Sequence, residues 1–405
     1  GKTLTISGAG TLTIAAGKTL TVVGTANFGG RPVTLKSTSI GTAAIGQVSG
    51  TLSNATNVTV ERYVTARRRW RALTAPLMGS TNNSIFYNWQ NNGTPSGNTG
   101  AIIWRPTGGT GFWSGGAATS ILSFNSSGNS WTPLTSTNTA LFDGSGNNAY
   151  MVFVTGPYNT SGNYVTSGSA VTTLSATGTL RSGNIIYTDA VAQDKFYMFG
   201  NPYASAINLK TVTKSGFGSS AYLWNPSLGS VGGWNTISMG GTGTLPVQSG
   251  QAFFLYANSA SNTLTFKESD KLTGSALSYF RNEQQVVDGE MNIELNKYVD
   301  GKAELYDMTT VTYKGGNADR LPKLAQIYEN LSVYQNGADF GVANRTLVNG
   351  EDNVQLRIWQ MNEANYQLKI NLSSMKLPAG TTAVLVDAFL NKETSLSLDR
   401  DNLVD

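Results

Sequence analysis

Apolar and polar residues alternate in short runs along the N-terminal part of the chain. Three runs recur every eight residues, Thr3–Ile6, Thr11–Ile14 and Thr19–Val22, with Gly- and Ala-rich turns between them. Each run places two aliphatic side chains on one face of a strand and two threonines on the other. Such a strand cannot bury its apolar face alone, so the pattern favours a β-solenoid-like stack, with a meander of short strands as the alternative. The first run begins at residue 3, which suggests further rungs upstream or rungs from another subunit.

Beyond residue 56 the apolar runs lengthen, and clusters of Gly, Asn, Ser and Pro separate them. Many short strands with such turns and no helical period are typical of β-sandwiches and jelly rolls. We therefore predict an all-β protein in which a solenoid-like segment precedes duplicated sandwich modules and a C-terminal sandwich. The predicted domains are 1–56, 57–190, 191–280 and 281–405.

The two central modules share an internal repeat. The sequence around Trp104 resembles that around Trp224, and each is followed by a second tryptophan, Trp131 in one case and Trp234 in the other. Because a duplicated plan is a strong fold signal, we expect both copies to have similar strands. We expect the four tryptophans to occupy equivalent core positions.

Composition narrows the possible chemistry. Only 13% of the residues are charged, 46 are Gly, and the chain contains neither Cys nor His. Disulfides, thiolate or imidazole metal ligands, Cys nucleophiles and His bases are therefore excluded. We expect no catalytic residues and no enzyme activity. No apolar run is long enough to span a membrane.

Charge is distributed unevenly along the chain. Residues 1–190 contain 11 Lys and Arg but three acids, whereas residues 281–405 contain 12 basic and 18 acidic residues. The densest basic run, Arg67–Arg71, enters an apolar strand, so we expect alternate arginines to point to solvent. Nucleic-acid binding would require basic residues repeated along a face with stacking aromatics, and it is not expected. Glu268 and Asp270 share one side of a strand end, where a solvated turn explains them better than catalysis.

Two weak ligand sites can be named. Asp143 and Asn147 place oxygen atoms in a Gly-rich turn that Ca²⁺ would accept, although a plain turn is the simpler interpretation and no other cofactor is expected. Trp89, Trp113 and Tyr158 lie in the insertions of the first module, where aromatic rings would stack on glycans if a sugar site exists.

Several segments resemble large exported surface proteins of the Bacteroidetes type. The tract Phe196–Asn208 contains a GNPYxSxI-type signature, and Leu245–Phe254 is similar to the closing strand of the same module. The segment Val384–Thr394 resembles a strand and turn of the β domain that precedes a sorting tail. The resemblance implies export through the type IX secretion system and an extracellular or outer cell-surface location. It does not imply one activity, because such modules occur in adhesins, fibres and enzyme fusions.

Two classes of function follow. The first is a structural or adhesive surface protein, a subunit of a linear homo-oligomeric filament assembled through β-strand edges. The alternative is a glycan-binding adhesin or an accessory module of a secreted enzyme.

Overall fold

The computed structural model is almost entirely β, with 52% strand and 2% helix, which confirms the expected all-β fold. The structure describes residues 3–79, 81–93, 99–143, 148–158, 164–188, 192–226, 228, 232–240, 243–272, 289–313, 321–345, 352–375, 377 and 380–405. The chain forms two compact units, the first comprising Gly1–Phe217 with Met239–Arg281 and the second Gly218–Ser238 with Asn282–Asp405. The four-part division of the sequence stays a prediction.

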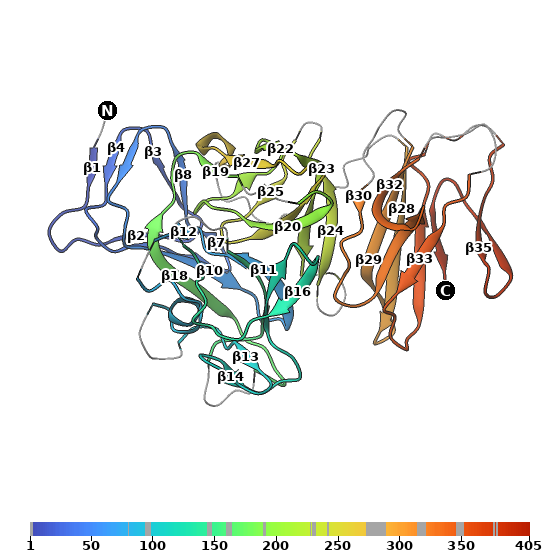
Figure 1. The fold of residues 1–405 in the computed structure, drawn as a ribbon, viewed down its shortest axis with the longest axis horizontal. Coiled ribbons are helices and arrows are strands. Elements are labelled where there is room, and N and C mark those ends of the chain that lie inside the picture. The colour runs from blue at the N-terminus through green and yellow to red at the C-terminus, as the bar shows by residue number, and fades with distance from the viewer. Residues whose placement is uncertain are drawn as a thin grey trace. The chain divides into compact units, whose positions relative to one another are not determined.

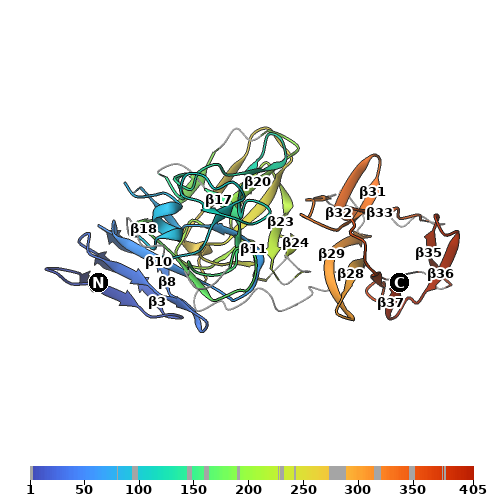
Figure 2. The same ribbon diagram turned by 90° about the horizontal axis from the view of Figure 1, so that it is seen from below.

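The N-terminal strands form three parallel ladders. In order within each ladder, the strands are β1 (Thr3–Thr5), β4 (Thr25–Asn27) and β9 (Thr51–Ser53); β2 (Leu12–Ile14), β5 (Val33–Leu35) and β10 (Val58–Val64); and β3 (Thr19–Val22) with β8 (Ala44–Val48). Paired positions lie 21 to 26 residues apart, as in Thr3 opposite Thr25 and Leu12 opposite Val33. The parallel arrows are visible in Figures 1 and 2.

This pairing shows where the three runs of the eight-residue repeat lie in the fold. The three runs belong to three different ladders, so they do not pair with one another; each pairs with a strand from the next stretch of chain. We interpret the ladders as successive turns of a coiling chain, with three short strands in the first turn. The residues that fill its interior include Ile14, Val22, Phe28 and Leu35, all buried in the same hydrophobic cluster as the strands that follow.

The first unit continues with sheets that are antiparallel except for the parallel pair formed by Trp104–Arg105 and Trp113–Ser114. The strands are β6 (Ser37–Thr38), β7 (Gly41–Thr42), β11 (Arg69–Thr74), β12 (Leu77–Met78), β13 (Trp104–Arg105), β14 (Trp113–Ser114), β15 (Ile121–Asn125), β16 (Ser130–Pro133), β17 (Ala149–Val154), β18 (Thr172–Leu180), β19 (Ile185–Tyr187), β20 (Lys195–Gly200), β21 (Ile207–Asn208), β22 (Thr213–Ser215), β25 (Pro246–Val247), β26 (Ala252–Ala257) and β27 (Thr263–Phe266). Short helical segments occupy Phe86–Gln90 (η1) and Glu268–Asp270 (η2). β18 pairs with β10, and β11, β17, β15 and β16 form one sheet in that order.

The internal repeat is visible in strand register. Thr74 lies opposite Ala149 in the pair β11–β17, and Gly200 lies opposite Ala252 in the pair β20–β26. In the sequence, Thr74-Ala75-Pro76 corresponds to Gly200-Asn201-Pro202, and Ala149 corresponds to Ala252. The two antiparallel pairs therefore repeat with the same register.

The tryptophan correspondence is wrong in one of its two parts. Trp131 lies opposite Phe124 in the antiparallel hairpin β15–β16, and Trp234 lies opposite Trp224 in the hairpin formed by β23 (Phe217–Asn225) and β24 (Gly233–Ser238). The two ring pairs have nearly the same geometry, with centroids 5.1 and 5.0 Å apart and interplanar angles of 69° and 75°. Trp104 instead lies in β13, parallel to β14. Phe124 is thus the counterpart of Trp224, because hairpin pairing, and not the Trp-containing sequence, is what repeats.

The second unit contains the hairpin β23–β24 and a larger sheet. Its other strands are β28 (Glu290–Val299), β29 (Lys302–Thr312), β30 (Leu321–Pro322), β31 (Asn330–Gln335), β32 (Ala338–Asn344), β33 (Leu356–Trp359), β34 (Tyr366–Asn371), β35 (Ala383–Asp387), β36 (Lys392–Leu396) and β37 (Asp401–Val404). The sheet runs β33-β31-β32-β29-β28-β34-β37, and β35 pairs with β36 as a separate hairpin. Apolar side chains from β28, β29, β31 and β34 form the hydrophobic core of this sheet.

Candidate functional site

The first N-terminal coil carries unpaired strand edges. β1 and β2 are the end strands of their sheets, and β3 has β8 as its one partner in its sheet within the described part of the chain. All three residues of β1 are exposed, and Leu4 retains 39% of its accessible surface. Backbone N–H and C=O groups on such edges are free to pair with another strand.

An apolar groove lies beside these edges. It has a volume of about 420 Å³ and is lined by residues 3–4 and 20–26. Leu4 and Leu20 contribute to the lining, and Val23 at its rim is 75% exposed. The groove therefore combines apolar surface with a strand edge, which are the two features that strand addition uses.

The N-terminal segment that carries this groove is basic in sequence. Residues 1–60 contain Lys2, Lys18, Arg31 and Lys36 and no acidic residue. The first acid, Glu61, binds Lys36 at 2.6 Å and accepts a hydrogen bond from the Ser37 amide. A partner surface that complements this segment would be acidic.

The second unit has its own strand edges. β37 ends the described sheet, and its Leu403 is 61% exposed. The hairpin β35–β36 exposes Val384, Val386 and, at its turn, Phe389. Residues 381–405 contain five acids and two basic residues, so these apolar edges carry negative charge.

The structure separates the three predicted sugar-binding aromatics. Trp89 is only 3% exposed and packs edge-on against Tyr150, so it belongs to the core and is not a ligand platform. Trp113 is 44% exposed, and its ring lies 5.1 Å from that of Tyr158 at 74°. Two of the predicted residues are thus brought together in a T-shaped pair on the surface.

The calcium site stays a prediction, because the described residues do not test it. The carbonyl oxygen of Asp143 accepts a hydrogen bond from Arg181, and Asn147 lies outside the described residues. Among the described residues, no group of three or more acidic side chains could hold a metal ion.

Glu268 and Asp270 were predicted to lie in a solvated turn, and the structure shows instead that both carboxylates bind other groups of the first unit. Glu268 accepts hydrogen bonds from the amides of Val48 and Gly183, each at 2.8 Å, and binds the buried Lys271 ammonium at 2.8 Å. Asp270 is 2% exposed and closes the short helix η2 by accepting from the Lys267 amide. Because these oxygens are already occupied by donors, the pair has a structural role.

The arginine run agrees with its prediction only in part, because Arg67 is exposed but Arg68 has other partners. Arg68 does not point to solvent; it donates hydrogen bonds to the carbonyls of Tyr164, Val165 and Gly168 at 2.8 to 3.0 Å. Arg69 and Arg71 are only partly exposed. Arg68 thus anchors the loop at residues 164–168, and the other arginines of the run stay partly or fully exposed.

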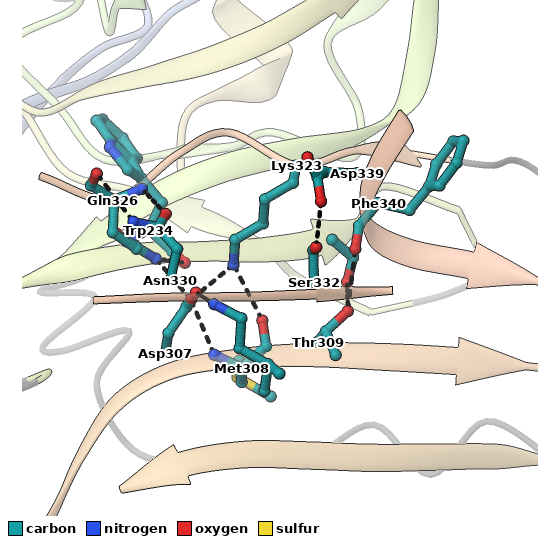
Figure 3. Close-up of polar contacts among 12 residues, drawn as sticks. Trp234, Asp307, Met308, Thr309, Lys323, Gln326, Asn330, Ser332, Asp339 and Phe340 are labelled. Carbon is teal, nitrogen blue, oxygen red and sulfur yellow. Dashed lines mark hydrogen bonds and ion pairs between the residues drawn. The ribbon is translucent and has the colours of Figure 1, made fainter. Parts of the chain in front are cut away.

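A buried polar network lies in the second unit (Figure 3). A β-bulge between β28 and β29 shifts the register beside Asp307, whose carboxylate is fully buried. One carboxylate oxygen accepts from Lys323 at 2.6 Å and from Gln326 at 2.9 Å, and the other accepts from the Leu331 amide at 2.6 Å. With its oxygens occupied, this aspartate is a structural anchor and not a free acid or base.

Gln326 extends this network to the tryptophan hairpin. Its side-chain oxygen accepts from the Trp234 amide at 2.7 Å, and its amide nitrogen donates to the Trp234 carbonyl at 3.1 Å. The Tyr222 hydroxyl adds a bond to the Pro322 carbonyl at 2.8 Å. These contacts explain why hairpin β23–β24 groups with the C-terminal strands.

Comparisons of the chain with protein families, curated proteins and solved structures gave no match. Among the described residues, no helix has the length and apolar character needed to traverse a bilayer.

Proposed function

We propose that this chain is a non-enzymatic extracellular surface protein that assembles into a fibre through its open N-terminal strand edges. The observation that supports the proposal is the apolar groove lined by residues 3–4 and 20–26, which lies beside ladder-end strands. Strand addition there satisfies backbone hydrogen bonds and buries Leu4 and Leu20 in a single step. The resemblance of Phe196–Asn208 to Bacteroidetes surface proteins supports the extracellular location and export by the type IX system.

The occupant of the groove, in this proposal, is the second unit of another copy. Its end strand β37 and hairpin β35–β36 expose apolar side chains and carry net negative charge. Residues 1–60, in contrast, contain four basic residues and no acidic residue. Opposite charge steers such surfaces together and fixes their orientation. A head-to-tail contact between different surfaces that does not close into a ring produces a linear filament.

A charge placed in the groove tests this proposal. Leu4→Glu puts a carboxylate on the strand edge, where it repels an acidic partner and removes apolar contact. Val171→Glu is the matched control, because Val171 is a similarly exposed aliphatic residue (46%) elsewhere in the first unit. Sedimentation velocity over a concentration series should show growing assemblies for the wild type and the control, and monomers for Leu4→Glu. Assembly of Leu4→Glu equal to wild type, or a monomeric wild type at every concentration, would contradict the proposal.

Glycan binding is the second candidate, supported by the surface pair Trp113 and Tyr158. The C–H groups on one face of a sugar ring pack against the face of an aromatic ring. The Tyr158 ring, in its T-shaped contact, holds the indole of Trp113 in place. Screening the protein on a glycan array should give ligands whose binding is lost in Trp113→Ala and kept in Trp131→Phe, which alters an aromatic residue of the hairpin β15–β16. Equal loss in both variants, or no retained glycan, would remove this candidate.

A further inference from the structure

The turn of hairpin β35–β36 holds two large apolar side chains in solvent. Phe389 is 93% exposed, the highest value among the large apolar side chains of the described residues, and its neighbour Leu390 is 63% exposed. A scattered apolar residue on a surface needs no explanation, but two adjacent ones at a turn leave a concentrated apolar area in water. We call these two side chains the Phe389 tip.

Hydrogen bonds hold the backbone of the Phe389 tip in one conformation. The Asp387 carboxylate accepts bonds from the amides of Phe389 and Leu390, both at 2.9 Å, and Asn391 follows with a φ of +49°. Asp and Asn suit such positions because Asp bonds the local backbone and Asn tolerates positive φ. Because the turn is already ordered before it meets a partner, binding through it loses less conformational entropy.

The hairpin behind the tip is attached to the second unit through one face. Leu385 and Leu396 pack against the hydrophobic core of that unit. Val384 and Val386 belong to the opposite face, as strand alternation requires, and about half of the surface of each is exposed. The hairpin is therefore held firmly on its inner side and presents apolar side chains on its outer face and at its turn.

The groove of the first unit matches the tip in size and polarity. Its lining includes Val22 and Ala26, which are buried members of the core cluster, so the groove opens directly onto the hydrophobic core. Its volume of about 420 Å³ lies within the range of pockets that enclose small ligands, and it therefore has room for an aromatic ring. An aromatic side chain that fills an apolar pocket is the commonest kind of interface hot spot.

We propose that the Phe389 tip of one copy inserts into this groove of the next copy and anchors the contact between them. The inference rests on the proposed function and identifies which residues of the second unit bind. Charge favours a second copy as the partner. Residues 381–405 contain five acids and two basic residues, whereas the exposed Lys18 lies just before the groove-lining Leu20.

Phe389→Ser tests the anchor, and Tyr328→Ser is the control for an exposed aromatic residue of the same unit. In sedimentation velocity, Phe389→Ser should weaken association by roughly 30-fold or more, the loss typical of a hot spot, while the control assembles as the wild type does. Normal assembly of Phe389→Ser, together with a monomeric Leu4→Glu, would overturn the anchor and leave the proposed function standing. A wild type that stays monomeric would overturn both.

Disulfide cross-linking locates the contact, because the chain has no cysteine of its own. Val23→Cys places a thiol at the rim of the groove, and Leu390→Cys places one in the tip. Mild oxidation of a mixture of these two single variants should give a covalent dimer that contains one copy of each. Val171→Cys, at another exposed position of the first unit, should cross-link to Leu390→Cys only at background level. Equal yields from the two mixtures would overturn the placement of the tip in the groove.

Discussion

The ammonium group of Lys323 lies 2.6 Å from the carboxylate of Asp307, and both side chains are buried in the second unit. Their separation along the chain is short, but the contact depends on the β-bulge beside Asp307 and on the segment that follows β30. Gln326 shares the same carboxylate and reaches the Trp234 backbone (Figure 3).

Replacing Asp307 with Asn should strongly destabilise the second unit. The change leaves the Lys323 ammonium buried without its counter-charge, and breaking a buried pair costs about 3–5 kcal/mol. The free energy of unfolding from urea denaturation is the measurement. Asp300→Asn in an exposed turn is the control and should change stability by less than about 0.5 kcal/mol. Equal midpoints for the two variants would mean that the network contributes little.

Stability should fall at acidic pH, partly because of Glu329. Burial opposes ionisation of this group, but hydrogen bonds from Lys297, Asn362 and Tyr366 prevail and hold its pKa below the ordinary value of 4.5. Its contribution is therefore present above pH 4.5 and is lost as the pH falls through the lowered pKa of the folded state. Urea midpoints across this pH range should decline less steeply in Glu329→Gln than in the wild type. Parallel curves would contradict the assignment.

The Trp224 ring should tolerate no side chain at Gly232. This glycine has φ +100°, and a Cβ atom there would lie 2.6 Å from the indole. Gly337 also has positive φ, but a Cβ there would meet nothing within 4 Å. Both alanine variants carry backbone strain, and only Gly232→Ala adds overpacking, worth about 1–3 kcal/mol more. Comparing the two free energies of unfolding isolates the steric contribution, which would be absent if they were equal.

Replacing Glu268 should lower the free energy of unfolding of the first unit far more than replacing Glu61. Glu268→Gln replaces a carboxylate that binds the buried Lys271 and two backbone amides, so we expect a loss of about 3–5 kcal/mol. Glu61→Gln weakens the half-exposed pair with Lys36 and should cost at most about 1 kcal/mol. Denaturant unfolding of both variants provides the comparison. A larger effect at Glu61 would contradict the structural role of Glu268.

Local patterns predicted much of this protein. The alternation in Thr3–Ile6 and its repeats predicted short strands, and turn residues separated the longer ones correctly from each other. The sequence repeat predicted similar strands in both copies, and the strand pairs that place Thr74 opposite Ala149 and Gly200 opposite Ala252 agree with it. These succeed because side-chain alternation and turn chemistry act over a few residues.

Partners distant in sequence were not predictable in the same way. The eight-residue repeat favoured a β-solenoid-like stack without saying which strands would be partners, and the structure pairs the three runs with strands 21 to 26 residues away. Trp104 was expected to match Trp224, yet Phe124 occupies the corresponding hairpin position. In the sequence, Trp104 and Trp224 correspond because both are tryptophans. In the fold, the two hairpins share the same cross-strand pairing, and the position opposite the second tryptophan is occupied by Phe124 in one hairpin and by Trp224 in the other.

The sequence by itself determined the all-β class, the uneven charge and the exclusion of His and Cys chemistry, because composition and period-two alternation are properties of the chain alone. Tertiary structure decided which side chains are buried and what they contact. It placed Trp89 in the core and Trp113 on the surface. Burial depends on which sheet faces which, and that is fixed by contacts between segments far apart in the sequence.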